Sequence, residues 1–335
     1  MLIRRLLVIL STFVGGLATT GATAPDLARP PVLSLPIACE PGRTCEVQHY
    51  VDHDPGPGAR DYRCGVQTYE GHNGVDFRLP DMAAERAGVA VLAAAAGRVA
   101  RVRDGVADIS VRAPGATSVE RLECGNGVVL DHGGGWETQY CHMARGGISV
   151  QVGQMVTAGT PLGRVGLSGN TEYPHLHLTV RHNGRVTDPF APDLAEGACA
   201  AAAAPGLWSA AARAKLPYRP GAVLNAGFSR GPVSMADVEA GAVAAPGPEQ
   251  PYLVAYARAI ALLPGDVVEM RLTGPKGAAL ATARQPPLDR WKAQTLTYIG
   301  KKRPVSGWPA GVYAAEVRIL RKGAVTASRR TQLRF

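Results

Sequence analysis

Short apolar runs alternate with glycine-containing turns across residues 71 to about 196, a pattern typical of β-strands joined by tight turns. No long segment of this stretch has the apolar spacing of an amphipathic helix. We therefore predict an all-β domain built on an antiparallel sheet with a groove. Its expected strands are Val89–Ala96, Gly97–Arg103, Val106–Arg112, Gly127–Asp131, Glu137–His142 and His175–Arg181.

A second set of segments with period-two alternation fills residues 207–335. About seven short strands separated by turn signals are typical of an immunoglobulin-like β-sandwich. No motif in this stretch carries catalytic chemistry. The expected strands are Val223–Ser229, Tyr252–Ile260, Asp266–Leu272, Gln294–Ile299, Gly311–Leu320 and Val325–Phe335.

The beginning of the chain predicts a secretory signal. Arg4 and Arg5 precede an apolar run that is too short to span a bilayer, and small residues follow as far as Ala24. An uncleaved membrane anchor is the alternative; otherwise no stable membrane insertion is expected after signal removal. The expected sections are a signal peptide (1–24), a disulfide-stapled extension (25–70), the groove domain (71–198), a linker (199–206) and the sandwich (207–335).

The positive charge of the chain belongs to its last section. From residue 205 onward there are 19 Lys and Arg against 7 Asp and Glu, a net charge of +12. The whole chain has a net charge of +9, so residues 1–204 together carry −3. Such a surface could hold the protein on an anionic polymer by long-range attraction, or it could simply be a solvated sheet face. Nucleic acid is not expected as a partner because export removes the usual target.

Six cysteines precede residue 200, and an even number in an exported protein favours disulfides. Cys124 and Cys141 flank two expected strands joined at Gly133–Gly135, which would place them together at the open end of a hairpin. Cys39 and Cys45 would close a small local loop. The remaining pair, Cys64 and Cys199, would tie the two borders of the groove domain together.

Two short motifs offer metal-ligand chemistry. His72 and Asp76 lie four residues apart and His175 and His177 two apart, so in extended strands each pair shares a face. Imidazole and carboxylate are ligands of catalytic zinc, where three protein ligands leave one position for water. A partly exposed pair of histidines without a metal is the alternative for the second motif.

The surrounding sequence resembles the LytM/lysostaphin-type zinc metallopeptidases, a peptidoglycan endopeptidase family with the duplicated hybrid motif fold. The resemblance covers residues 71 to about 190, and its blocks occur in the family's order. These blocks are Gly71–Asp76, Gly125–Trp136 with Thr138–Met143, Val152–Gly163 with Gly166–Asn170, and Pro174–Leu178.

This resemblance implies a role for each candidate residue. His72, Asp76 and His177 would hold Zn²⁺, and His142 and His175 would be the catalytic histidines that are not ligands. The resemblance does not say which of these two is the general base. Asn170 and Tyr173 would line the groove as substrate contacts, or would pack a loop.

The implied function is that of a secreted or periplasmic zinc endopeptidase that cuts the peptide cross-links of peptidoglycan. Bonds between D-alanine and diaminopimelate are the expected substrate, with glycine bridges as the alternative. A catalytically latent regulator that binds the wall is the second possibility, because residues 25–70 could cover the groove. A biotinyl or lipoyl carrier is excluded, since no lysine precedes Lys215.

His49 and His53 lie in the extension, near several aspartates. They could form a second metal site or a plug for the groove, but turn-forming sequence around them favours a structural or surface role.

Overall fold

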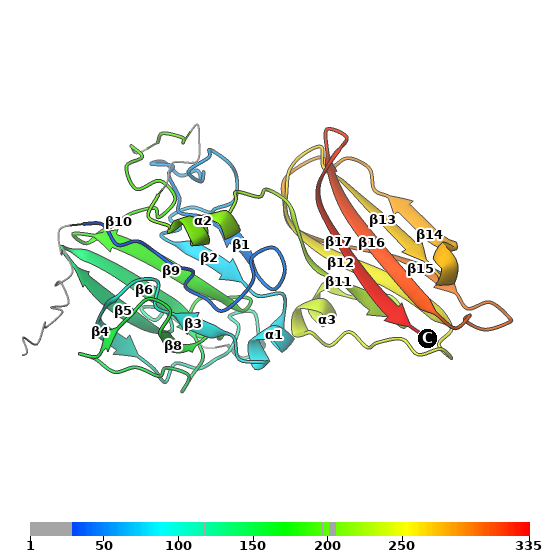
Figure 1. Cartoon of the computed structure of the whole chain (residues 1–335), viewed down its shortest axis with the longest axis horizontal. Coiled ribbons are helices and arrows are strands. Elements are labelled where there is room, and N and C mark those ends of the chain that lie inside the picture. Colours follow the sequence, from blue (N-terminus) through cyan, green and yellow to red (C-terminus); the bar gives the residue numbers. More distant parts are fainter. Residues whose placement is uncertain (1–28, 117, 196, 201–205) are drawn as a thin grey trace, which may run out of the picture.

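The computed structural model describes residues 29–335 except 117, 196 and 201–205, and consists of two β-rich parts side by side (Figure 1). The expected signal peptide and most of the expected linker lie outside the described residues. In the described part of the chain, no helix is long and apolar enough to cross a membrane.

An antiparallel sheet forms the first part, in the order β1-β2-β9-β6-β5-β4-β7, with β10 paired to β9. A small second sheet pairs β3 with β8. This arrangement confirms the predicted all-β class. The strands are β1 (Glu46–His49), β2 (Val75–Arg78), β3 (Ala90–Leu92), β4 (Gly97–Arg103), β5 (Asn126–Gly133), β6 (Trp136–Met143), β7 (Met155–Val156), β8 (Pro161–Arg164), β9 (His175–His182) and β10 (Arg185–Val186).

One expected strand of this part is wrong. Val106–Arg112 is a loop with a single isolated bridge from Asp108 to Ser168, and the Asp108 carboxylate accepts hydrogen bonds from the backbone N–H groups of Leu167 and Arg145. Strands β1, β2, β7, β8 and β10 were not predicted. The section predicted as a disulfide-stapled extension also joins the sheet, since β1 pairs with β2 at its edge. Leu33 and Ile37 of the extension are also fully buried in the core.

The second part is the predicted sandwich. The three-stranded sheet β11-β12-β15 packs on the four-stranded sheet β14-β13-β16-β17 around an apolar core. All six expected segments are strands, and only β14 was missed. The strands are β11 (Ala222–Ser229), β12 (Tyr252–Leu262), β13 (Val267–Thr273), β14 (Ala279–Arg284), β15 (Lys292–Lys302), β16 (Val312–Arg321) and β17 (Ala324–Arg334).

Three short helices and a 3₁₀ turn complete the fold: α1 (Met82–Arg86), α2 (Ala210–Lys215), α3 (Met235–Ala240) and η1 (Pro275–Gly277). Helices α1 and α3 lie where the two parts meet (Figure 1). Gly241 ends α3 in the left-handed conformation (φ 63°), and a Cβ there would lie 2.5 Å from the Cβ of Ala83. Glycine is therefore needed at this contact for both conformation and space.

The structure contains the three disulfides Cys39–Cys45, Cys64–Cys199 and Cys124–Cys141, which is the pairing that the sequence favours. Cys64–Cys199 joins residues 135 positions apart and closes the borders of the first part. Loop closure of this length removes much conformational entropy from the unfolded chain.

Glu46 of β1 makes the stability of the fold depend on pH. Its side chain is buried near Arg219 and Arg329, and burial, partly offset by these arginines, raises its pKa from 4.5 to about 7. A carboxyl whose pKa is raised by folding stabilises most below its unfolded pKa, and this stability is lost as the pH rises through the folded value.

We therefore expect Glu46→Gln to be more stable than the natural chain at pH 8, by on the order of 1–3 kcal/mol, and nearly equal to it at pH 4.5. Thermal unfolding at both pH values measures this. Glu40→Gln is the matched control, because Glu40 is exposed. An equal difference at both pH values would contradict the assignment to Glu46.

Candidate metal centre

The pairing of β2 with β9 builds the site. Asp76 lies directly opposite His177, and the neighbours of each along its strand are core residues. Because opposed residues of paired strands share a face, the apolar pairs enter the core, and Asp76 and His177 meet on the other face. His175 lies two residues before His177 on that same face, as expected for a strand.

His72, Asp76 and His177 converge closely. The Nε2 atom of His72 lies 3.2 Å from Oδ1 of Asp76 and 3.2 Å from Nδ1 of His177, and these last two atoms are 2.9 Å apart. Ligands bonded to a tetrahedral zinc ion at about 2.0–2.1 Å lie roughly 3.3 Å from one another. All three residues are buried. This triangle therefore has nearly the size that one tetrahedral metal ion requires.

The outer nitrogen of each histidine in this triangle is held by a neighbour. Nδ1 of His72 lies 2.6 Å from the carbonyl oxygen of Tyr50, and Nε2 of His177 lies 3.0 Å from both Oδ1 of Asn73 and Oγ1 of Thr179. Donation of the outer N–H to these acceptors leaves the inner nitrogen with its lone pair facing Asp76. Such second contacts are what fixes the tautomer of a ligating imidazole.

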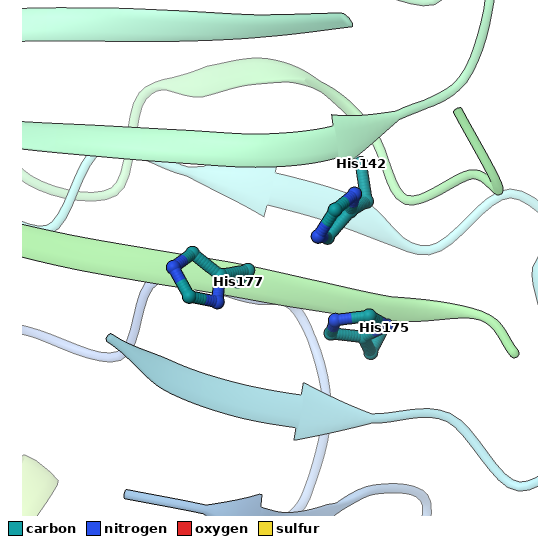
Figure 2. Close-up of side chains that lie close together, drawn as sticks. All are labelled: His142, His175 and His177. Carbon is teal, nitrogen blue, oxygen red and sulfur yellow. The ribbon is translucent and has the colours of Figure 1, made fainter. Parts of the chain in front are cut away.

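His142 and His175 complete the cluster, and Figure 2 shows both rings beside His177. Their ring centroids are 4.6 Å apart. Nδ1 of His142 donates to the carbonyl oxygen of Ser168 (2.9 Å), and Nδ1 of His175 to that of Tyr173 (3.0 Å). Nε2 of His175 lies 3.5 Å from Oδ1 of Asp76, whereas Nε2 of His142 has no hydrogen-bond partner among the described residues. A ligand atom from each of His142, His175 and His177 also lies within 4.8 Å of the other two, so this second group could hold a metal as well.

The backbone at His142 is unusual. Its φ of 60° is in the left-handed region, which residues with a side chain adopt at a cost of about 1–3 kcal/mol. The N–H of His142 donates to the carbonyl oxygen of Cys124 (2.8 Å), and the Cys124–Cys141 disulfide ties the same two segments. These two links hold His142 in the conformation that turns its ring toward His175.

Burial and charge set the protonation of the cluster. Burial lowers the pKa of His142 well below its usual value and, although Asp76 opposes it, lowers that of His175 to about 4. Burial would raise the pKa of Asp76, but the surrounding histidines hold it well below its usual value. Burial also acts against protonated His72, but the Asp76 carboxylate outweighs it and raises that pKa. His142 and His175 are therefore neutral near pH 7.

His49 is part of this site, which its sequence position did not indicate. It lies opposite Asp76 in the pairing of β1 with β2, and its Nδ1 lies 2.9 Å from Oδ2 of Asp76. Of the expected structural or surface role, burial excludes the surface position, because this residue is 9% exposed. His53 lies elsewhere, with its Nε2 2.8 Å from Asp188, so these two histidines do not form a second metal site together.

Two cavities flank the cluster and form one groove, with Tyr69 and Asn170 lining both. The first, of about 370 Å³, is lined by His72, His142 and His177, and the second, of about 360 Å³, by His49, Tyr173 and His175. Asn170 is exposed, whereas the half-buried Tyr173 accepts a hydrogen bond from Gln48 (2.8 Å). The structure thus places both residues beside the cluster, with Asn170 the more accessible.

Comparison with known proteins bears on this site. Residues 70–189 match Peptidase family M23, and the chain therefore carries an M23 peptidase domain. It is 31% identical over 123 residues to the peptidoglycan DD-endopeptidase ShyB of Vibrio cholerae, covering 37% of this chain and 23% of that protein. It is 31% identical over 144 residues to the DD-carboxypeptidase/endopeptidase Mpg of Neisseria meningitidis, covering 42% and 28%.

Among solved structures, the chain is similar to the catalytic domain of lysostaphin from Staphylococcus simulans, with 26% identity, a TM-score of 0.28 and coverage of 40% of this chain and 86% of that one. The chain spans less than a third of the length of the curated relatives named above.

The Cys124–Cys141 disulfide should support the strand end that carries His142. Replacing both cysteines with Ala is expected to cost about 2–4 kcal/mol of unfolding free energy, because the closed loop of the unfolded chain is released. Thermal and denaturant unfolding measure this, and peptide mapping without reduction checks the bond. Free thiols at both positions in the natural protein would overturn the expectation.

Proposed function

We propose that this chain, through its M23 domain, is a zinc metalloendopeptidase that hydrolyses peptide cross-links of peptidoglycan in the cell envelope. One observation carries the proposal: three buried ligand atoms in a triangle of 2.9–3.2 Å lie beside two neutral histidines in one groove. The three disulfides agree with an oxidising compartment such as the periplasm or the exterior.

His72, Asp76 and His177 are the proposed zinc ligands. They include a carboxylate, which offsets the charge of the ion, whereas His142, His175 and His177 offer only imidazole nitrogens. The Nδ1 atoms of His142 and His175 are engaged by backbone carbonyls, and both residues line the groove. When bound, zinc acts as a Lewis acid and lowers the pKa of a bound water to about 7.

His142 and His175 are the proposed groups for proton transfer. A neutral imidazole accepts the proton of the attacking water through Nε2, and the same atom, once protonated, donates a hydrogen bond to the oxyanion or a proton to the leaving amine. The backbone carbonyls of Ser168 and Tyr173 fix the tautomer that this role needs.

The groove also fits an anionic peptide. Arg103, Arg121 and Arg181 line the first cavity, where Arg181 donates to Gln139 at 2.7 Å. Glu123 is the one acidic residue of that lining. A surplus of positive charge favours substrates that carry free carboxylates, as stem peptides of peptidoglycan do.

A latent regulator is the less supported function. The extension supplies Gln48, His49 and Tyr69 to the groove lining, but the first cavity remains beside His72, His142 and His177. No position of the five-residue set is replaced. The proposed peptidase activity therefore accounts for more of the site residues than a purely binding role does.

The metal assignment predicts one zinc ion per chain. His72→Ala should reduce zinc content at least tenfold, because it removes one of three protein ligands. Elemental analysis of protein purified without added metal measures this, with His182→Ala as a control outside the cluster. Equal zinc in the natural protein and in His72→Ala would remove the assignment.

The activity assignment is tested by digesting purified sacculi and identifying the released muropeptides by mass spectrometry. Release of uncrosslinked peptides is expected from the natural protein. His142→Ala and His175→Ala should each keep their zinc and lower the rate by roughly 10²–10⁴. Loss of zinc in either variant would make that residue a ligand. A natural protein that carries zinc and releases nothing would favour the regulator.

A further inference from the structure

A buried cluster of charges joins the sandwich to the groove domain beside the metal centre. The Arg78 side chain of β2 is 1% exposed, and that of Arg258 in β12 is fully buried. Both arginines donate to Oε2 of Glu239 in α3, Arg78 at 2.6 Å. A buried guanidinium is costly without a partner, so both parts of the molecule depend on this single carboxylate.

The cluster continues into the strand end that follows β2. Arg258 also donates to the carbonyl oxygen of Pro80 and to Oδ1 of Asn225, the latter at 2.9 Å. Asn225 in turn donates to Asp81 at 3.1 Å. The sandwich therefore holds the segment that immediately follows Asp76 and Arg78 through several hydrogen bonds rather than through one exposed pair.

Arg78 transmits this contact to the groove. It lies two residues after Asp76 on the same face of β2, and it donates to Gln48 at 2.7 Å. Its guanidinium lies 3.9 Å from the ring centroid of Tyr173, a cation–π distance. The carbonyl oxygen of Tyr173 is the acceptor for Nδ1 of His175. A continuous series of contacts thus runs from Glu239 to the catalytic histidine.

The sandwich also supplies part of the groove wall. Ala293 and Gln294, exposed residues near the start of β15, line the 360 Å³ cavity together with Tyr173 and His175. Around this cavity Gln294 and Tyr173 offer amide and hydroxyl groups, and Arg78 is already paired with Glu239, so that the exposed Glu172 is the remaining charged group outside the cluster. Amide and hydroxyl groups suit the amide bonds of a peptide segment.

We propose that the sandwich is part of the peptidase groove: Ala293 and Gln294 contact the substrate segment on the His175 side, and Glu239 is a positioning residue that acts through Arg78 and Tyr173. This rests on the proposed function. Beyond the basic surface that could hold the protein on an anionic polymer, this gives the sandwich a part in which peptide the groove accepts.

The wall is tested with Ala293→Trp in the full-length zinc-loaded protein, assayed on a soluble cross-linked muropeptide. We expect KM to rise about tenfold or more with little change in kcat, because an indole fills space that the substrate occupies in ground and transition state alike. Ala279→Trp is the matched control, an exposed alanine of β14 outside the groove lining. An unchanged KM in Ala293→Trp would contradict the proposed contact between Ala293 and the substrate.

The positioning role is tested with Glu239→Gln, which keeps the shape and removes the charge. We expect kcat to fall about tenfold with zinc content retained, and partial recovery in Glu239→Asp. Glu249→Gln is the control, since Glu249 pairs with Arg303 on the exposed surface of the sandwich. A lower melting temperature with unchanged kcat and KM would reduce Glu239 to a structural residue.

Binding separates this inference from the proposed function. Calorimetric titration of the same muropeptide into His175→Ala protein, with and without Ala293→Trp, needs no turnover. Weaker binding caused by Ala293→Trp would support the proposal that the sandwich lines the groove. This holds even if the natural protein cuts nothing, in which case only the proposed function fails. Equal binding with and without Ala293→Trp, or no binding to either protein, would contradict the proposal that the sandwich contacts the substrate.

Discussion

The buried carboxylate of Asp76 is the constraint on which the site depends. An ionised carboxylate at 1% exposure is too costly to keep without partners, and here four histidines supply them. These histidines come from β1, β9 and the segment before β2, so one charge fixes the relative positions of three parts of the sheet. The register that sets Asp76 opposite both His49 and His177 is therefore also what assembles the candidate metal centre.

The local sequence pattern was sufficient to predict features that depend on neighbouring residues of one strand. The alternation of β9 places His175 and His177 on one face, and the spacing of His72 and Asp76 indicated a shared pocket before any pairing was known. Six of the seven strands of the sandwich and five of the ten strands of the first part followed from period-two segments. Val106–Arg112 alternates in the same way but forms only one isolated bridge, at Asp108, whose carboxylate binds backbone N–H groups of other loops.

What the sequence could not show are contacts set by the pairing of distant strands. His49 reaches Asp76 because β1 lies beside β2, and no spacing in the extension encodes that pairing. Glu239 meets Arg78 across 161 positions, and one acidic residue within a basic section reads as surface charge until its burial is known. Residues that hold the site from outside, rather than form it, were thus the ones that pattern reasoning missed.

The two ends of the groove are chemically unlike, and the sheet order explains this. The end beside His142 is lined by residues of β4, β6 and β9, and Arg103 of β4, Arg181 of β9 and Arg121 of the loop before β5 give it positive charge. At the other end, β1 extends the sheet beside β2, the sandwich adds Ala293 and Gln294 to the lining, and the one arginine there, Arg78, is paired with Glu239. The described lining therefore offers arginines on one side of the candidate metal centre and, beside Glu172, amide and hydroxyl groups on the other.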